Sequence, residues 1–120
     1  MTEQKKHFAK ITSSKSTYQV YYNQDLLLES NQVLELIEQN DGRVYPTVIY
    51  FPDTVISRLD TQPTTLVTHC PIKGDANYRS YERAENGIWS YDHPIGGVEL
   101  LKDHVAFDQN KGFNVKLKTD

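Results

Sequence analysis

The side chains best suited to chemistry in this sequence are gathered in one short segment, residues 69–78. That segment places the thiol of Cys70 and the amine of Lys73 beside an imidazole and a carboxylate, around a turn that contains a proline and a glycine. A second run of aromatic and polar side chains follows at residues 89–94. Few structural turns need so many functional groups, so the two segments predict the place of a site without specifying a reaction.

Three side chains are candidates for reactive or proton-handling roles: Cys70, Glu38 and His104. A nucleophilic thiol needs a nearby base or cation that lowers its pKa. Lys73 and His104 are better candidates for that partner than His69, because neighbours along a strand point to opposite faces. The alternative is that Cys70 is a small buried apolar residue, as free cysteines usually are.

Glu38 is a candidate because of the strand that would carry it. If residues 31–39 form a strand, Glu38 shares a face with Leu34 and Leu36. An inward carboxylate is costly unless it is paired or functional. The alternative places Glu38 at the rim, where the register breaks beside the next turn. His104, at the start of an apolar strand, is either a general base or an ordinary hydrogen-bonding residue.

Lys73 is the candidate anchor for an anionic group. It precedes Gly74 in a turn that could expose backbone N–H groups, and an ammonium beside such groups binds a carboxylate or a phosphate. So tight a turn predicts a positive φ at Gly74. The glycine spacing of a P-loop is missing, and the alternative role is a solvated turn lysine.

An aromatic wall would complete a small-molecule pocket, with ordinary core packing as the alternative. The candidates for this wall are Tyr50, Tyr78, Trp89 and Tyr91.

The composition is that of one ordinary globular domain, with 120 residues, 38% of them hydrophobic and 24% charged, and a formal net charge of −3. The negative charge argues against nucleic acid as a partner, and no apolar run approaches the roughly 20 residues that cross a membrane. One cysteine and four dispersed histidines form no familiar ligand motif, so neither a metal nor another cofactor is expected. The single cysteine and the lack of a signal-peptide pattern favour the cytoplasm. No feature of the sequence indicates an oligomeric state.

Short β-prone runs separated by turns predict a mainly β, single-domain fold. We expect an antiparallel barrel or folded sheet with one or two short helical turns. Residues 1–16 are polar and are expected to form a flexible N-terminal arm, and residues 17–120 the β domain. The predicted strands are 18–22, 26–30, 31–39, 45–51, 64–70, 76–82, 88–91, 105–107 and 113–118, with helical turns at 52–59 and 98–101.

Some of these predictions rest on single residues. The segment 31–39 could also form a short helix with an apolar face, but the Asp41-Gly42 turn that follows favours a strand. Pro46 indicates an edge strand, Pro63 an irregular loop, and residues 85–87 a turn.

Two motifs carry a resemblance to a known family: Cys-Pro-x-Lys-Gly at residues 70–74 and Trp-Ser-Tyr at residues 89–91. The other residues that match are Ser30, Glu38, Pro46, 50–52, Val55, Ala76, Tyr78, Pro94 and 104–107. In this order they resemble the domain-of-unknown-function family numbered 427, which is also carried under a nucleotidyltransferase-domain label, over residues 17–118. The resemblance implies a small, mainly β, soluble bacterial or fungal protein and assigns no activity. Asn31-Gln32 stand where basic residues are common in the family, which argues against anion binding there.

Three functions follow as hypotheses. The first is a soluble domain, an enzyme or a binding protein, that holds a small molecule, with an anion as one option, in a Tyr- and Trp-lined pocket between the two segments above. The second is a non-catalytic module that offers a tyrosine-rich surface to a protein partner. The third is the nucleotidyltransferase of the family label, although the chain lacks the clustered carboxylates that hold metal ions in that chemistry. Convergence of Glu38, Lys73, Tyr91 and His104 in one concave site favours the first, and tyrosines on a flat exposed face favour the second.

Overall fold

Residues 7–119, the part of the chain that the computed structural model describes, form eleven strands and three short 3-10 helices. The strands are β1 (His7–Ser14), β2 (Tyr18–Tyr22), β3 (Asp25–Ser30), β4 (Val33–Asn40), β5 (Arg43–Val44), β6 (Val48–Pro52), β7 (Thr61–Cys70), β8 (Gly74–Tyr81), β9 (Ala84–Ser90), β10 (His104–Phe107) and β11 (Phe113–Leu117). The helices are η1 (Asp53–Arg58), η2 (Glu99–Leu101) and η3 (Gln109–Lys111). No helix in this range is long and apolar enough to cross a membrane.

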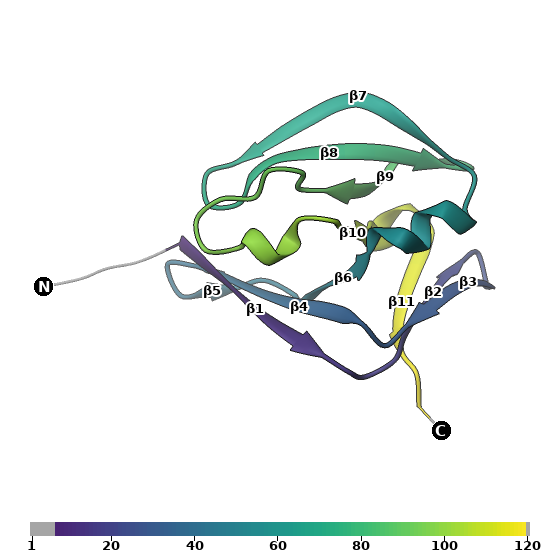
Figure 1. The fold of residues 1–120 in the computed structure, drawn as a ribbon, viewed down its shortest axis with the longest axis horizontal. Coiled ribbons are helices and arrows are strands. Elements are labelled where there is room, and N and C mark those ends of the chain that lie inside the picture. The colour runs from purple at the N-terminus through teal and green to yellow at the C-terminus, as the bar shows by residue number, and fades with distance from the viewer. Residues whose placement is uncertain (1–6, 120) are drawn as a thin grey trace, which may run out of the picture.

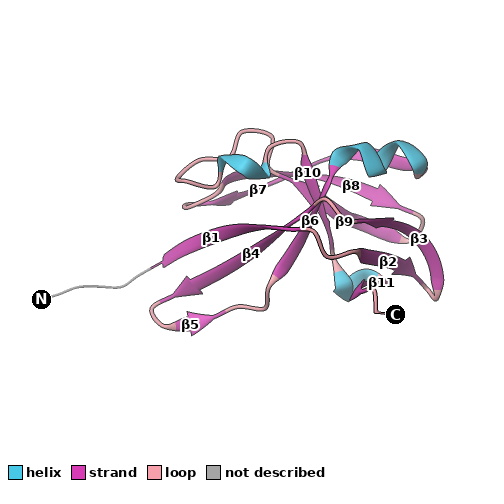
Figure 2. Cartoon of the chain, turned by 60° about the horizontal axis from the view of Figure 1, so that its bottom comes forward, coloured by secondary structure: helices cyan, strands magenta, loops and turns pink. Residues whose placement is uncertain are grey.

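The strands form two antiparallel sheets. The larger has eight strands in the order β1-β4-β6-β10-β9-β8-β7, with β5 beside β4, and the smaller has the order β11-β2-β3. The large sheet folds over without closing, because its two end strands, β1 and β7, do not pair with each other. Figure 1 shows β7 and β8 on one side of the molecule and β1 and β4 on the other, and in both Figure 1 and Figure 2 the small sheet lies at the end away from the N-terminus. Of the two expected forms, the folded sheet is confirmed and the barrel is not.

Strand alternation sends apolar side chains to both faces of the large sheet and builds two cores. One core lies against the small sheet, where Phe51 and Val105 pack with Phe113. The other core contains Tyr50 and Ala106, which are the sequence neighbours of Phe51 and Val105, and we call it the inner core. Its buried residues are Leu34, Leu36, Tyr50, Ala76, Tyr91, Val98, Leu101 and Ala106.

The strand prediction for residues 31–39 is confirmed by β4. Asp41 and Gly42 in the following turn have φ values of 52° and 82°, the positive angles that a primed hairpin turn requires. Leu34 and Leu36 are buried in the inner core, and Glu38 follows them at the same two-residue spacing. The predicted inward orientation of Glu38 is therefore correct.

The expectation of a flexible arm over residues 1–16 is wrong for residues 7–14, which form β1. This strand pairs with β4 continuously, from His7 opposite Asn40 to Ser14 opposite Val33. Residues 1–6 lie outside the described residues. An edge strand with one face towards solvent needs few apolar residues. The polar composition of residues 7–14 therefore gave no clear indication of a strand.

Two prolines and one glycine turn are also placed differently from the prediction. Pro46 precedes β6, which lies between β4 and β10 and is not an edge strand. Pro63 lies within β7, an edge strand whose pairing with β8 is irregular between Pro63 and Val67, so the missing N–H is tolerated there. Residues 85–87 belong to β9, and the hairpin turn falls instead at residues 82–83.

Candidate functional site

A buried ion pair joins the two halves of the folded sheet. Glu38 comes from β4 and Lys73 from the turn between β7 and β8, and Nζ of Lys73 donates a hydrogen bond to Oε1 of Glu38. Lys73 is 8% exposed and is the only charged residue in the buried class among residues 7–119. Its Nζ also lies 5.8 Å from the ring centre of Tyr91. The ammonium is thus held between a carboxylate and an aromatic face, and we call Glu38, Lys73, Tyr50 and Tyr91 the polar cluster.

The turn that carries Lys73 is fixed by backbone contacts. The N–H of Lys73 donates to the carbonyl of Cys70 at 3.3 Å, and the carbonyl of Lys73 accepts from the N–H of Ile95 at 3.1 Å. Gly74 has a φ of +106°, as predicted, and a Cβ there would lie 3.0 Å from the carbonyl oxygen of His93. Only glycine satisfies both the angle and the close approach of the 93–95 loop without strain.

The carboxylate of Glu38 is held in its ionised form. Burial raises the pKa of Glu38, but hydrogen bonds from His7 and Lys73, together with their charges, outweigh burial and leave the pKa below its usual value. Nε2 of His7 donates to Oε2 of Glu38 at 2.7 Å, so each carboxylate oxygen accepts one hydrogen bond. The Glu38 side chain is only 15% exposed, and a charge this buried needs such partners.

Tyr50 and Tyr91 add two phenol groups to the cluster. Tyr50 is 1% exposed and Tyr91 7%. Burial raises the pKa of both hydroxyls far above the usual tyrosine range, and the hydrogen bond that Nε1 of Trp89 donates to the Tyr50 hydroxyl, at 3.0 Å, offsets only part of the effect on Tyr50. Both hydroxyls therefore keep their protons at neutral pH. Among residues 7–119 the Tyr91 hydroxyl has no hydrogen-bond partner, and the Tyr50 hydroxyl accepts a bond without donating one.

The other predicted members of the aromatic wall and the free thiol surround this cluster. Cys70, Tyr78 and Trp89 are partly buried and pack against the inner core. Tyr78 is the most peripheral, because its hydroxyl shares a hydrogen bond of 2.8 Å with the Thr68 hydroxyl.

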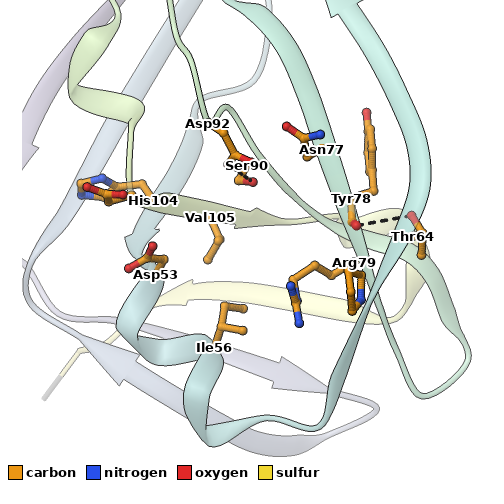
Figure 3. Close-up of a pocket in the computed structure, with 12 residues that line it drawn as sticks. Asp53, Ile56, Thr64, Asn77, Tyr78, Arg79, Ser90, Asp92, His104 and Val105 are labelled. Atoms are coloured by element: carbon orange, nitrogen blue, oxygen red, sulfur yellow. Dashed lines mark hydrogen bonds between the residues drawn. The ribbon is translucent and has the colours of Figure 1, made fainter.

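His104 lies elsewhere, so of the four residues expected to converge only Glu38, Lys73 and Tyr91 lie together. His104 is the first residue of β10, and its Nδ1 donates to the carbonyl of Lys102 at 2.9 Å. This bond holds the ring against the backbone just before the strand. His104 lines a cavity of about 400 Å³ that none of the polar cluster residues lines, and Figure 3 shows it beside Asp53 in that cavity.

His7 is a member of the site that the sequence did not indicate. Its ring reaches Glu38 diagonally across the β1–β4 pair, in which His7 stands opposite Asn40 and Ala9 opposite Glu38. The only signal was a weak alternation, in which Ala9 and Ile11 turn inward with His7. Within the described range, no three His, Cys, Asp or Glu side chains are grouped as metal ligands.

The polar cluster contains several hydrogen-bond donors. Lys73 has three N–H groups and uses one on Glu38, and the two phenols each retain an O–H. Glu38 is an ionised carboxylate next to them and could accept a proton. The cluster thus combines several hydrogen-bond donors with one ionised acceptor.

Comparison with known proteins places this domain in a family. No curated protein matches the chain. The chain does match, over residues 10–118, the family model labelled NTP_transf_9 and described as a domain of unknown function, DUF427. The match begins inside β1, so β1 belongs to the family domain and is not an appended arm. The resemblance carried by the Cys-Pro-x-Lys-Gly and Trp-Ser-Tyr motifs is confirmed, and the chain belongs to the DUF427 family.

Proposed function

We propose that this domain binds a small oxygen-rich molecule, a carboxylate or a carbonyl compound, at the polar cluster. The N–H groups of Lys73 and the hydroxyls of Tyr50 and Tyr91 would donate hydrogen bonds to the ligand. The observation that carries the proposal is Tyr91, a buried residue whose ring lies beside the Lys73 ammonium and whose hydroxyl has no hydrogen-bond partner within residues 7–119.

A buried hydroxyl without a partner is unusual enough to need a reason. Most buried polar side-chain atoms in native proteins are hydrogen-bonded, and leaving one unpaired costs about 1–3 kcal/mol. A phenylalanine at position 91 would keep the packing of the ring and its contact with the Lys73 ammonium while avoiding that cost. A tyrosine there is explained if its hydroxyl contacts a ligand.

The buried ion pair supports the same conclusion. Replacing a buried ion pair by well-packed apolar residues is often neutral or stabilising, so such a pair is weak evidence for a stabilising role. Strongly shifted pKa values next to a charge pair are common at functional sites. The lowered pKa of Glu38 keeps its carboxylate ionised as a hydrogen-bond acceptor, and the raised pKa of Tyr91 keeps its hydroxyl protonated as a hydrogen-bond donor in the same cluster.

Catalysis at this site would be proton transfer. Glu38, ionised at neutral pH, would take a proton from the bound molecule, and the Lys73 ammonium with the Tyr91 hydroxyl would stabilise the negative charge that develops on an oxygen of the substrate. Cys70 lies at the margin of the cluster and is not needed for this chemistry.

The two other hypotheses lack a supporting observation. None of the eight tyrosines is in the exposed class, so a flat tyrosine-rich docking face is not favoured. For the nucleotidyltransferase of the family label, the described residues offer no carboxylate group arranged around metal ions. Titration with a nucleoside triphosphate and magnesium tests that function directly.

The proposed function is tested with the protein as isolated. Native mass spectrometry of the wild type should show a bound small molecule, and mass analysis after denaturation should identify it as a carboxylate or carbonyl compound. Tyr91→Phe should lose that molecule, and its thermal stability should equal or exceed that of wild-type protein from which the molecule has been removed, because in that comparison only an unpaired hydroxyl is lost.

Tyr81→Phe is the matched control. Tyr81 also lacks a hydrogen-bond partner for its hydroxyl among residues 7–119, but it packs against Tyr22 and Phe113 in the other core. This variant should keep the bound molecule. If Tyr91→Phe retains the molecule as well as Tyr81→Phe does, the Tyr91 hydroxyl is not part of a ligand site and the proposal fails.

A further inference from the structure

The cavity of about 400 Å³ shown in Figure 3 is separate from the polar cluster. Its floor is the face of the large sheet that carries Asn77 and Arg79 of β8, Ser90 of β9 and Val105 of β10. One wall is η1, with Asp53 and Ile56. The volume lies within the range of small-molecule sites.

The opposite wall of the cavity is the irregular part of β7. Between Pro63 and Val67 this strand leaves its register with β8. Thr64 is held there by its own contacts, since its hydroxyl donates to Oδ1 of Asn86 at 2.5 Å and lies 3.3 Å from the carbonyl oxygen of Tyr78. Pro63 and Thr64, at the start of this irregular stretch, both line the cavity.

Arg79 brings an unpaired positive charge into the cavity. Its Nε donates to the Thr61 hydroxyl at 2.7 Å, which fixes the side chain, and its terminal N–H groups have no partner within residues 7–119. In Figure 3 the guanidinium extends along the floor towards Ile56. A planar guanidinium with free N–H groups binds a carboxylate with two parallel hydrogen bonds.

Acceptors lie on the side of the cavity formed by η1 and the start of β10. The carboxylate of Asp53 has no hydrogen bond or ion pair within the described range. His104 lies beside it in Figure 3. Because Nδ1 of His104 donates to the Lys102 carbonyl, Nε2 of the neutral ring is an acceptor. Arg79 and Asp53 form no ion pair with each other, so the two opposite charges are held apart across one cavity.

Opposite charges held apart, with the apolar side chains of Ile56 and Val105 between them, match one chemical class of ligand. We propose that this cavity binds a free α-amino acid with an aliphatic side chain. The carboxylate of the amino acid pairs with Arg79, its ammonium group with Asp53 and His104, and its side chain contacts Ile56 and Val105. This site is additional to the one proposed above and does not depend on it.

The test uses L-leucine as the probe and two analogues that each lack one charge: 4-methylpentanoate, without the ammonium group, and 3-methylbutylamine, without the carboxylate. Binding is followed by the amide shifts of the ¹⁵N-labelled full chain. L-leucine should shift the amides of residues 53–56, 77–79 and 104–105, and each analogue should bind about tenfold more weakly or worse, because a charge-assisted contact is lost.

Two variants assign the ends of the ligand. Asp53→Asn should weaken leucine binding about tenfold and leave 4-methylpentanoate binding unchanged, and Arg79→Gln should weaken leucine and leave 3-methylbutylamine unchanged. The exposed residues Glu82 and Arg83 supply controls, Glu82→Gln and Arg83→Gln, which should bind leucine like the wild type. If Arg79→Gln unfolds, Asp53→Asn alone decides, because the Asp53 carboxylate makes no hydrogen bond or ion pair with another described residue.

Three outcomes would overturn this inference. Leucine could cause no shifts in the named amides, the analogues could bind as tightly as leucine, or Asp53→Asn could bind leucine unchanged. Tyr91→Phe should not affect leucine binding, and this separates the inference from the proposed function.

Discussion

Substitution of Lys73 by methionine perturbs the polar cluster with the least change in shape. Methionine keeps most of the aliphatic stem and removes the ammonium, so the carboxylate of Glu38 retains only His7 as a partner. The Glu38 side chain is 15% exposed, and removing one partner of a buried ion pair costs about 3–5 kcal/mol. Because the Glu38 carboxylate keeps one hydrogen bond, we expect the low end of this range, about 3 kcal/mol.

The double variant Lys73→Met with Glu38→Gln separates the cost of an unpaired charge from the cost of lost packing. It removes both charges, so its stability should return to within about 1 kcal/mol of the wild type. For a domain of this size, 3 kcal/mol corresponds to a melting temperature lower by about 12 °C and a urea midpoint lower by about 1.5 M.

Urea unfolding followed by tryptophan fluorescence is a suitable assay, because Trp89 is the only tryptophan and lies beside the cluster. The reasoning is refuted if Lys73→Met is as stable as the wild type, since Glu38 would then not depend on Lys73. It is also refuted if the double variant is as unstable as the single one, since the loss would then come from packing.

Three further predictions concern pH, the turn and the first strand. The folded-state pKa of Glu38 lies below its usual value of 4.5, so the stabilisation that the ionised Glu38 contributes is complete above pH 4.5 and is lost as the pH falls through the folded-state pKa. Acid should therefore destabilise the wild type more than the uncharged double variant, as measured by urea midpoints. Gly74→Ala should cost at least about 2 kcal/mol, because of its positive φ and the contact with the His93 carbonyl, whereas Gly42→Ala, with positive φ but open space, should cost about 1 kcal/mol in the same assay. Deletion of residues 1–14 should lower the melting temperature by many degrees, because residues 7–14 form a fully paired strand, and an unchanged value would show that β1 is dispensable.

Features that depend on a few neighbouring residues could be predicted from the sequence. The Asp41-Gly42 hairpin and the positive φ of Gly74 follow from the conformational freedom of those residues. The inward position of Glu38 follows from the two-residue repeat of its strand. These local features marked Glu38 and Lys73 as separate candidates, but their contact across the folded sheet depends on distant pairing.

Features that depend on distant pairing could not be predicted. His7 and β1 are stabilised by β4 across a long sequence separation, and nothing in the polar N-terminal segment indicates that partner. His104 looked like a member of the site because of its place in the sequence, but a backbone carbonyl next to the strand holds its ring elsewhere. The cavity between Arg79 and Asp53 arises only when β8 and η1 are packed together.

The most direct test of the central claim is a high-resolution crystal structure of the protein as purified, without added ligand. The account predicts a bound organic molecule whose oxygen atoms lie within hydrogen-bonding distance of the Tyr91 hydroxyl and Nζ of Lys73. If the Tyr91 hydroxyl is instead hydrogen-bonded to another protein group, and Lys73 contacts Glu38 alone, the polar cluster is a structural clasp between the two halves of the sheet and the proposed ligand site is contradicted.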